Sequence, residues 1–142
     1  MKQMKHFLIL LALIVGLTAC AADKQKIEDT PNDGVEVLYF HGKQRCATCQ
    51  AIENETKALV ESQFADEVKS GKIRFRIVDI TKAENEALAD KYEITWSSLV
   101  LVKYDNGKET SENLTKFAFA NARSNPALFK KDLAAKINLM LK

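Results

Sequence analysis

The sequence lacks several features that would point to particular classes of protein. Its 142 residues contain no repeat and no segment of low complexity, and apolar and charged residues are mixed as in a single globular domain. The longest apolar run is too short for a membrane-spanning helix, which needs about 20 apolar residues. No Lys-rich or Arg-rich run is present, so nucleic acid is not an expected partner.

The first twenty residues differ from the rest of the chain. Lys2 and Lys5 precede an apolar run over residues 7–17, and small residues follow it; this layout predicts a secretory signal peptide. The end of the segment, LTAC at residues 17–20, resembles the lipobox of bacterial lipoproteins. The resemblance implies a lipoprotein signal peptide over residues 1–19 and a lipid on Cys20, although an ordinary secreted protein with a stray cysteine is the alternative. We therefore expect a protein of the bacterial cell envelope, lipid-anchored on the outer (periplasmic or extracellular) side of a membrane.

Residues 20–34 are predicted to be the lipidated Cys20 and a flexible tether, because residues 21–34 are polar and end in the breakers Pro-Asn-Asp-Gly. The folded domain is expected over residues 35–142. The formal net charge of the whole chain is +2, and loss of Lys2 and Lys5 with the signal peptide leaves the mature chain close to neutral. This balance again argues against nucleic acid as a partner.

The hydrophobic pattern predicts an α/β domain with the order β-α-β-α-β-β-α. Strands are expected over residues 35–41, 72–80, 98–104 and 109–115, with an Asn106-Gly107 hairpin turn between the last two. Helices are expected after the cysteine pair, over residues 65–70 and 82–92 (with Thr81 as N-cap), and from Pro126 onward, capped by Ser124 or Asn125. Because helices join the first three strands, these strands are expected to be mutually parallel.

Two helices show a clear apolar face. In the helix after the cysteine pair, the predicted core face comprises Cys49, Ile52, Thr56, Leu59, Val60 and Phe64. In the last helix, it comprises Leu128, Leu133, Ile137, Met140 and Leu141. The first pattern places Cys49 on the buried side of its helix and leaves Cys46 at the mouth of the fold.

The two cysteines at the start of a helix are suited to thiol chemistry. With Cys20 lipidated, Cys46 and Cys49 are the remaining thiols of the chain, and a four-residue loop makes a structural disulfide of little value. Free N–H groups at a helix start stabilise a thiolate, and Lys43 and Arg45 add positive charge. Such surroundings lower a cysteine pKa from about 8.5 to between roughly 3.5 and 7.5. Cys46 would attack a substrate disulfide, and Cys49 would resolve the mixed disulfide.

Residues 35–142 resemble the thioredoxin-fold superfamily. The resemblance rests on the strand before CATC at residues 46–49, on VDITKAENEALADKYEI at residues 78–94, and on the apolar strand, Asn-Gly hairpin and closing helix that follow. It implies a thioredoxin-like fold, with a central mixed sheet of about four strands flanked by helices. It also implies exchange with the thiols and disulfides of envelope proteins, and a redox-recycling partner.

The chain departs from the pattern of that superfamily at three places. The family's cis-proline, which faces the cysteines and helps to bind substrate, is replaced by Ser98, so we expect a trans Ser97-Ser98 bond and a rebuilt loop of Trp96, Ser97 and Ser98. Arg45 stands where the family has an aromatic residue. The buried acid on the preceding strand has no counterpart in LYFH at residues 38–41.

Three side chains are candidates for supporting the thiolate or moving its proton. His41 lies at the end of the first strand and is either such a group or a rim histidine bonded to the loop. Glu53 lies one helical turn beyond Cys49 and is either a proton acceptor or part of a solvated helix face. Arg45 stabilises the thiolate or is simply exposed, and Trp96 lines a substrate groove or packs against the domain.

Three functions compete. The first is a membrane-tethered thiol–disulfide oxidoreductase that needs no cofactor and no metal and uses Cys46 and Cys49. The second is a protein that binds a soft metal, Cu(I) or Zn(II), through Cys46, Cys49 and His41, although no Met-rich or His-rich run is present and zinc normally takes four ligands. The third is an interaction module that kept the fold but lost exchange chemistry. Replacing Cys46 separates the three.

Overall fold

The computed structural model describes residues 33–142. Their elements are β1 (Gly34–His41), α1 (Ala47–Gln63), α2 (Ala65–Lys69), β2 (Ile73–Asp79), the 3-10 helix η1 (Ala83–Asn85), α3 (Glu86–Lys91), β3 (Ser98–Asp105), β4 (Lys108–Asn113), α4 (Thr115–Asn121) and α5 (Pro126–Met140). The predicted signal peptide, the lipidated Cys20 and residues 21–32 of the tether lie outside these residues and stay predictions. No helix within residues 33–142 is long and apolar enough to cross a membrane.

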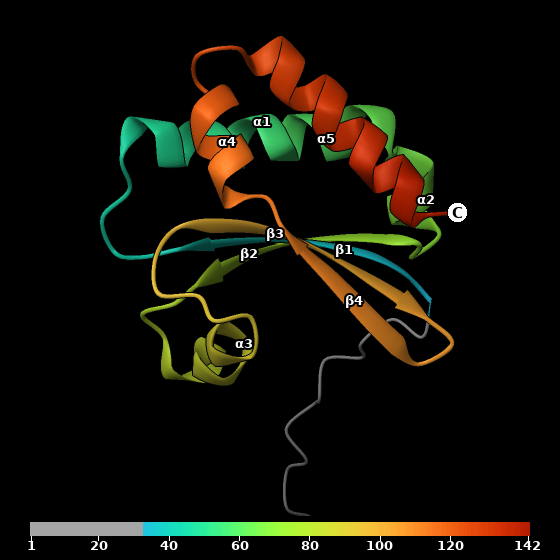
Figure 1. Ribbon diagram of the computed structural model, residues 1–142, viewed down its shortest axis with the longest axis horizontal. Helices are drawn as coiled ribbons and strands as arrows, with labels where there is room; N and C mark the ends of the chain where they lie inside the picture. The colour runs from blue at the N-terminus through green and yellow to red at the C-terminus, as the bar shows by residue number, and fades with distance from the viewer. Residues whose placement is uncertain (1–32) are drawn as a thin grey trace, which may run out of the picture.

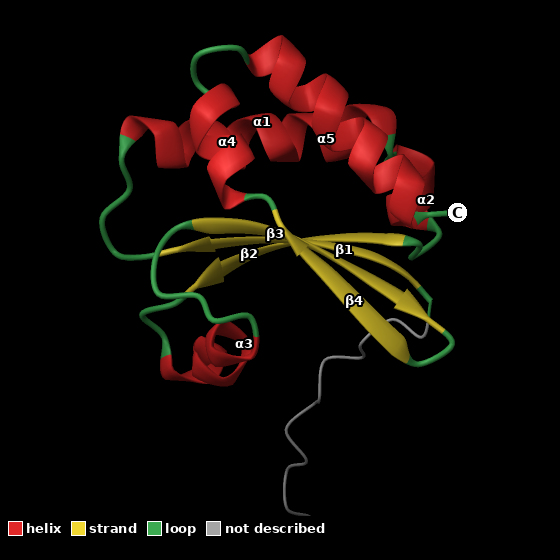
Figure 2. Cartoon of the chain, in the orientation of Figure 1, coloured by secondary structure: helices red, strands yellow, loops and turns green. Residues whose placement is uncertain are grey.

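The domain has three layers. Its four strands form one mixed sheet in the order β2-β1-β3-β4. Figure 1 shows α1, α4 and α5 on one face of this sheet and α3 on the other, and Figure 2 shows the strands between the two helical layers. The predicted class, an α/β domain with about four strands flanked by helices, is confirmed.

Alternation along β1 divides the core between the two faces of the sheet. Side chains on neighbouring residues of a strand point to opposite faces. Val35, Val37 and Tyr39 belong to the cluster that packs with α1 and α5, whereas Leu38 and Phe40 belong to the cluster on the α3 side. All five are fully buried, as expected for β1, which with β3 is one of the two interior strands of the sheet.

Helix α1 buries the face that its sequence predicts. Its apolar positions recur three and four residues apart, which places them on one side of the helix. All six predicted residues are buried against the sheet and α5: Cys49, Ile52, Thr56, Leu59, Val60 and Phe64. This packing fixes the orientation of the helix and therefore the position of the cysteine pair at its start.

The prediction that the first three strands are mutually parallel is wrong for β3. Strand β1 pairs in parallel with β2 but antiparallel with β3. The connection from β2 to β3 contains α3, whose 6 residues rise only about 9 Å, whereas the 7 residues of β2 span about 23 Å. So short a helix does not carry the chain back to the end of the sheet at which β2 begins. Strand β3 therefore begins at the end of the sheet at which β2 finishes, and runs in the opposite direction.

The connection after β2 also begins differently from the prediction. Thr81 does not cap a helix; instead its hydroxyl and its N–H both donate to the Asp79 carboxylate, at 2.7 and 3.0 Å. These bonds hold the pKa of Asp79 below its usual value. Both donors of Thr81 are used in this turn at residues 79–81, so Thr81 does not start a helix. The chain then forms η1 before α3.

The C-terminal part contains a helix that the sequence did not predict. Strand β4 ends at Asn113, and α4 follows at Thr115–Asn121. In α5, Asn125 is the N-cap, with its side chain accepting from Leu128 N–H at 3.2 Å. Leu133 and Ile137 are buried as predicted, but Phe129 is buried in place of Leu128, which is 38% exposed. Phe129 lies four residues before Leu133 and eight before Ile137, so it shares their face of the helix, whereas Leu128 does not.

The hairpin between β3 and β4 follows its prediction. Asn106 and Gly107 have φ angles of 51° and 78°, and Asp105 pairs with Lys108 across them. Two successive residues with positive φ are typical of the type I′ turn. This turn sets the register of the edge strand.

Candidate active site

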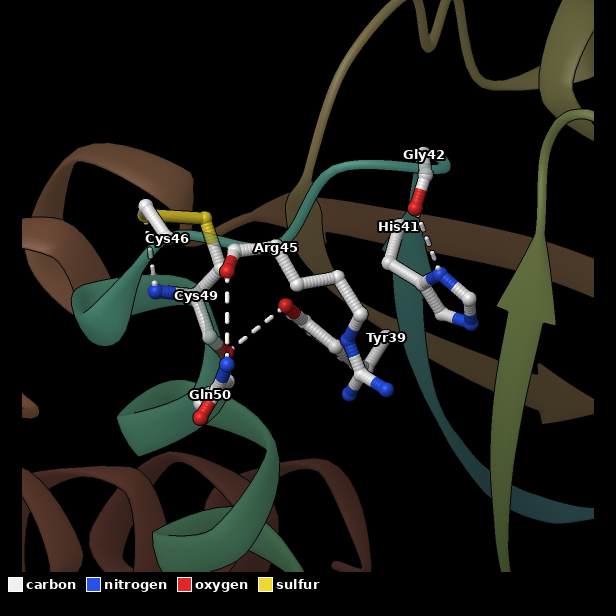
Figure 3. Close-up of a disulfide and its surroundings, with 7 residues drawn as sticks. All are labelled: Tyr39, His41, Gly42, Arg45, Cys46, Cys49 and Gln50. Atoms are coloured by element: carbon white, nitrogen blue, oxygen red, sulfur yellow. Dashed lines mark hydrogen bonds between the residues drawn. A yellow bond between two sulfur atoms is a disulfide. The ribbon is translucent and has the colours of Figure 1, made fainter.

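The cysteine pair lies where β1 passes into α1. Cys46 is the N-cap of α1, with an extended backbone, and Cys49 lies in the first turn. The two side chains form a disulfide, and their Cα atoms are 5.0 Å apart (Figure 3). The N–H of Cys49 donates to the Sγ atom of Cys46 at 3.1 Å. A sulfur at this position accepts one of the helix N–H groups that have no partner within the helix, and a thiolate accepts it more strongly.

The two cysteine residues differ in access to solvent. Cys46 is exposed, whereas Cys49 is buried with 6% of its surface exposed. An exposed thiol at a helix start meets an incoming disulfide, while a buried neighbour reaches only its partner. The arrangement is therefore suited to attack by Cys46 and resolution by Cys49.

Tyr39 lies beneath the pair and is a residue that sequence reasoning missed. Its hydroxyl donates to the carbonyl oxygen of Cys49 at 2.7 Å, in the buried interior. Burial raises the pKa of the Tyr39 hydroxyl above its usual value, although interactions with Ser97 and Arg45 oppose this. The hydroxyl is therefore a neutral donor that holds the backbone of Cys49. The alternation of side chains along β1 could have identified it, because Tyr39 shares its face of the strand with the core residues Val35 and Val37.

Arg45 and Glu53 form an ion pair below the first turn of α1. Their side chains are 31% and 16% exposed. In Figure 3 the Arg45 side chain runs toward Tyr39 and away from the sulfur–sulfur bond. The structure therefore brings two of the predicted support residues together, but the carboxylate of Glu53 contacts the guanidinium of Arg45.

His41 lies apart from the sulfurs. Its Nδ1 atom is 3.0 Å from the carbonyl oxygen of Gly42, and its ring stacks with Tyr39 at 6.2 Å between centroids. Figure 3 shows the ring pointing away from the disulfide. This geometry corresponds to a rim histidine bonded to the loop, one of the two roles considered for it.

A cleft of about 560 Å³ opens above the disulfide. Cys46 and Cys49 lie in its wall, together with residues from the loop before α1, from the loop before β3 and from α4: Gly42, Gln44, Arg45, Ile80, Thr95, Trp96, Ser97 and Phe119. Of the predicted substrate loop, Trp96 and Ser97 line this cleft and Ser98 does not. Phe119 was missed, because its segment had no predicted structure.

The loop before β3 is built without a cis peptide bond. Within residues 33–142 no peptide bond is cis, as predicted for Ser97-Ser98. Both serines are buried, and the Ser98 hydroxyl donates to the carbonyl oxygen of Trp96 at 3.1 Å. The N–H of Leu99 donates to Thr115 Oγ1 at 3.2 Å, so the start of α4 holds this loop in position.

The acid of β1 faces away from the cysteines. Glu36 is 2% exposed, but alternation places it on the α3 side of the sheet, opposite Tyr39. Its two carboxylate oxygens accept from Arg76 at 3.3 Å and from the Tyr104 hydroxyl at 3.2 Å. The position beneath the disulfide therefore holds a tyrosine hydroxyl and an Arg–Glu ion pair.

The metal hypothesis finds no ligand cluster in this part of the chain. Across residues 33–142, no group of three or more His, Cys, Asp and Glu side chains is arranged to hold a metal ion. His41 was the third ligand proposed, and its Nδ1 atom contacts Gly42. A soft metal at the cysteine pair would therefore have the two thiolates as ligands, without a cluster of three or more side chains from residues 33–142.

Comparison with known proteins places the fold. No protein-family model matches the sequence, and no curated protein matches it. Among solved structures, the fourth thioredoxin (Trx4) domain of ERdj5 is 20% identical, with 78% of this chain and 82% of that chain covered and a TM-score of 0.50. Thioredoxin f2 of Chlamydomonas reinhardtii is 18% identical, with the same coverage and a TM-score of 0.46. A thioredoxin of Thermus thermophilus is 15% identical, with 72% of each chain covered and a TM-score of 0.45. The described part of the chain therefore has the thioredoxin fold, with a Cys-X-X-Cys pair at the start of α1.

Proposed function

We propose that the protein is a thiol–disulfide oxidoreductase of the bacterial cell envelope, with Cys46 as the nucleophile and Cys49 as the resolving thiol. The observation that carries the proposal is the contrast within the pair. Cys46 is exposed at the N-cap of α1 and its sulfur accepts an N–H, while Cys49 is buried beside it. The fold agrees with this chemistry.

The reaction is a two-step exchange. In the reduced protein, the Cys46 thiolate attacks one sulfur of a substrate disulfide, forms a mixed disulfide and releases the other substrate sulfur as a thiolate. The Cys49 thiolate then attacks the Cys46 sulfur and displaces the second substrate thiolate, which takes up a proton. The substrate gains two electrons, and the Cys46–Cys49 pair becomes the disulfide. A recycling partner reduces it again, and the same steps run backward would oxidise a dithiol substrate.

The surroundings of the pair give each neighbour a task. The free N–H groups at the start of α1 and its dipole favour the Cys46 thiolate. Tyr39 holds the Cys49 carbonyl, so that the buried thiol stays within reach of Cys46. The Arg45–Glu53 pair keeps a carboxylate within one helical turn of Cys49, where Glu53 is the candidate acceptor of the Cys49 thiol proton.

The decisive experiment uses the full-length chain carrying Cys20→Ser, so that Cys46 and Cys49 are its only thiols. Equilibration in glutathione buffers, followed by mass spectrometry, measures the reduction potential of the pair. A two-electron transition near about −250 mV would favour a reductase, and one near about −150 mV an oxidant or isomerase. Failure to form a reversible disulfide in metal-free buffer would exclude the enzyme and leave the metal-binding protein and the interaction module, and metal binding would then be tested.

Two single replacements assign the roles of the cysteines. Cys49→Ser should trap a mixed disulfide through Cys46, because nothing resolves it, whereas Cys46→Ser should abolish exchange. Trapping through Cys49 in the Cys46→Ser chain would reverse the assignment.

We also propose that the lipid on Cys20 tethers the domain to the membrane. Three acyl chains bury many methylenes at about 0.8 kcal/mol each, which makes anchoring stable. Fractionation of cells that express the chain, with and without Cys20→Ser, tests this: the wild-type chain should sediment with membranes and the variant should not. Equal release of both chains would contradict the anchor without affecting the exchange chemistry.

A further inference from the structure

Strand β1 runs from the point where the predicted tether joins the domain to the loop that carries the cysteines. It begins at Gly34 and ends at His41, and Cys46 follows as the N-cap of α1. The 8 residues of the strand rise about 3.3 Å each, so it is about 26 Å long. The attachment point and the exchange site therefore lie at opposite ends of the sheet.

Two hydrogen bonds hold the backbone at the attachment point. The N–H of Asn106, in the β3–β4 hairpin, donates to the Asp33 carboxylate at 2.7 Å. The N–H of Val35 donates to the carbonyl oxygen of Lys72, just before β2, at 2.8 Å. Figure 1 shows the hairpin and the C-terminus at this end of the domain and the start of α1 at the other. The place at which the tether enters is therefore fixed relative to the cysteines.

The surface around the attachment point carries charges of both signs. A hollow of about 260 Å³ lies there, and three lysines and two aspartates are among the residues that line it: Lys72, Lys103, Lys142, Asp33 and Asp105. Because these charges nearly cancel, an anionic bilayer attracts this end of the domain only weakly. The point at which the tether pulls therefore decides how an anchored domain stands on the membrane.

The sequence limits how far the tether reaches. The chain takes 14 residue steps from Cys20 to Gly34, each of at most about 3.6 Å, so it spans no more than about 50 Å. An upright domain, with Cys46 farthest from the bilayer, needs none of this length. An inverted domain has to lift Gly34 by the length of β1, about 26 Å, which leaves the tether fewer conformations. Chain entropy therefore favours the upright arrangement.

We propose that the anchored domain stands with its cysteine pair away from the membrane, so that its exchange partners are soluble proteins or domains that extend into the aqueous compartment. The inference rests on the proposed exchange function and on the proposed lipid at Cys20, and it specifies where the cysteines of a partner lie. With the tether fully extended, Cys46 reaches about 75 Å from the bilayer. Disulfides at the bilayer surface are poor substrates, because only a tilted or inverted domain reaches them.

The orientation is measured by energy transfer on the full-length chain, purified from membranes with its lipid and reconstituted in vesicles that contain an acceptor-labelled lipid. One variant, Cys49→Ser, carries the donor fluorophore on Cys46. The other, Lys72→Cys with Cys46 and Cys49 replaced by Ser, carries it at an exposed position near the attachment point. The donor on Cys46 should lie about 20 Å farther from the bilayer than the donor at residue 72. Equal or reversed distances would overturn the inference.

The partner class is measured with one peptide disulfide in two places, free in solution and joined by a short linker to a lipid of the same vesicle. Deletion of residues 22–29 leaves 6 residue steps from Cys20 to Gly34, at most about 22 Å, which is shorter than β1. The deletion should slow the reaction with the lipid-bound peptide by about ten-fold or more and leave the reaction with the soluble peptide unchanged. Replacement of residues 22–29 by eight Gly and Ser residues keeps the length and should change neither rate.

The outcomes separate this inference from the proposals on which it rests. An unchanged rate with the lipid-bound peptide after the deletion would overturn the orientation and keep both the oxidoreductase and the anchor. A chain without lipid would overturn the anchor and this inference, and would leave the exchange chemistry in place. No reaction with either peptide would overturn the exchange function, and with it the class of partner inferred from the orientation.

Discussion

The two faces of the sheet bury polar groups for different purposes. Under α1, α4 and α5, the Tyr39 hydroxyl and the Arg45–Glu53 pair lie near the disulfide. Under α3, on the opposite face of the sheet, Glu36 accepts from Arg76 and Tyr104. One member of each set, Tyr39 and Glu36, belongs to strand β1. The comparison teaches that a buried charge in this fold marks the active face only if strand alternation points it toward the cysteines.

The largest effect is expected at alkaline pH, where both faces contribute. Burial raises the pKa values of all 3 tyrosines: Tyr39 on the cysteine side, and Tyr92 and Tyr104 on the α3 side. A raised folded-state pKa contributes stability that is complete below the unfolded value of 10.0 and is lost as the pH rises through the folded value. The free energy of unfolding should therefore fall steeply as the pH rises above about 10.

Chemical denaturation at about pH 8 and about pH 11, on either side of the tyrosine pKa, measures this loss. Tyr92→Phe should reduce the difference between the two free energies, because the phenol that titrates is gone. Since lysines titrate in every variant, the comparison between variants cancels their share. An unchanged difference in Tyr92→Phe would show that Tyr92 does not govern the alkaline loss.

Glu36→Ala should separate stability from exchange. Removal of the carboxylate takes away the acceptor that Arg76 and Tyr104 share, and should lower the free energy of unfolding by about 2 kcal/mol, less than for a fully buried pair because Arg76 is partly exposed. Urea denaturation measures the loss. The exchange rate per folded molecule should not change.

The matched control is Glu61→Ala, which removes an exposed i,i+4 pair with Lys57 and should cost less than about 0.5 kcal/mol. A change in exchange rate with Glu36→Ala would mean that the two faces are coupled.

Tyr39→Phe and Tyr104→Phe compare one lost hydroxyl on each face. Each change removes a buried hydrogen bond and should cost about 1–2 kcal/mol. Only Tyr39→Phe frees the carbonyl of Cys49, so it alone should shift the reduction potential of the pair, which glutathione equilibration measures. Equal reduction potentials in the two variants would show that Tyr39 does not position Cys49.

Glu93→Gly should have the smallest effect and should stabilise. Glu93 has a φ of 56° just after α3, where Ile94 N–H donates to Ala89 O at 2.8 Å and Glu93 N–H to Asp90 O at 3.0 Å. This is a Schellman cap, whose left-handed residue is usually glycine. Replacement should raise the free energy of unfolding by up to about 1 kcal/mol, measured by urea denaturation. Glu84→Gly in η1, where the backbone does not need positive φ, should lower it instead.

Much of the architecture could be predicted because it depends on local patterns. The apolar face of α1, the Asn106-Gly107 turn and the Asn125 cap each follow from residues that contact one another within a few positions. The direction of β3 could not, because it depends on the length of α3 relative to the strands. Helix α4 was missed because its 7 residues are too few to show a helical period in the sequence.

The candidate site divides in the same way. The cysteines and their place at a helix start follow from the spacing CATC after an apolar strand. Tyr39 could have been found from strand alternation, whereas Phe119 could not, because it reaches Trp96 across more than twenty residues of chain. Arg45 and Glu53 were both named, but their ion pair depends on how the loop enters α1.

The sequence by itself determined the α/β class, the cysteine pair at the start of α1 and the face that this helix buries, since periodicity and turn chemistry act over a few residues. Tertiary structure alone decided the antiparallel β3, the Arg45–Glu53 ion pair and the meeting of Trp96 with Phe119. These features depend on how distant segments pack into one core, and close packing selects among arrangements that local propensity leaves equal.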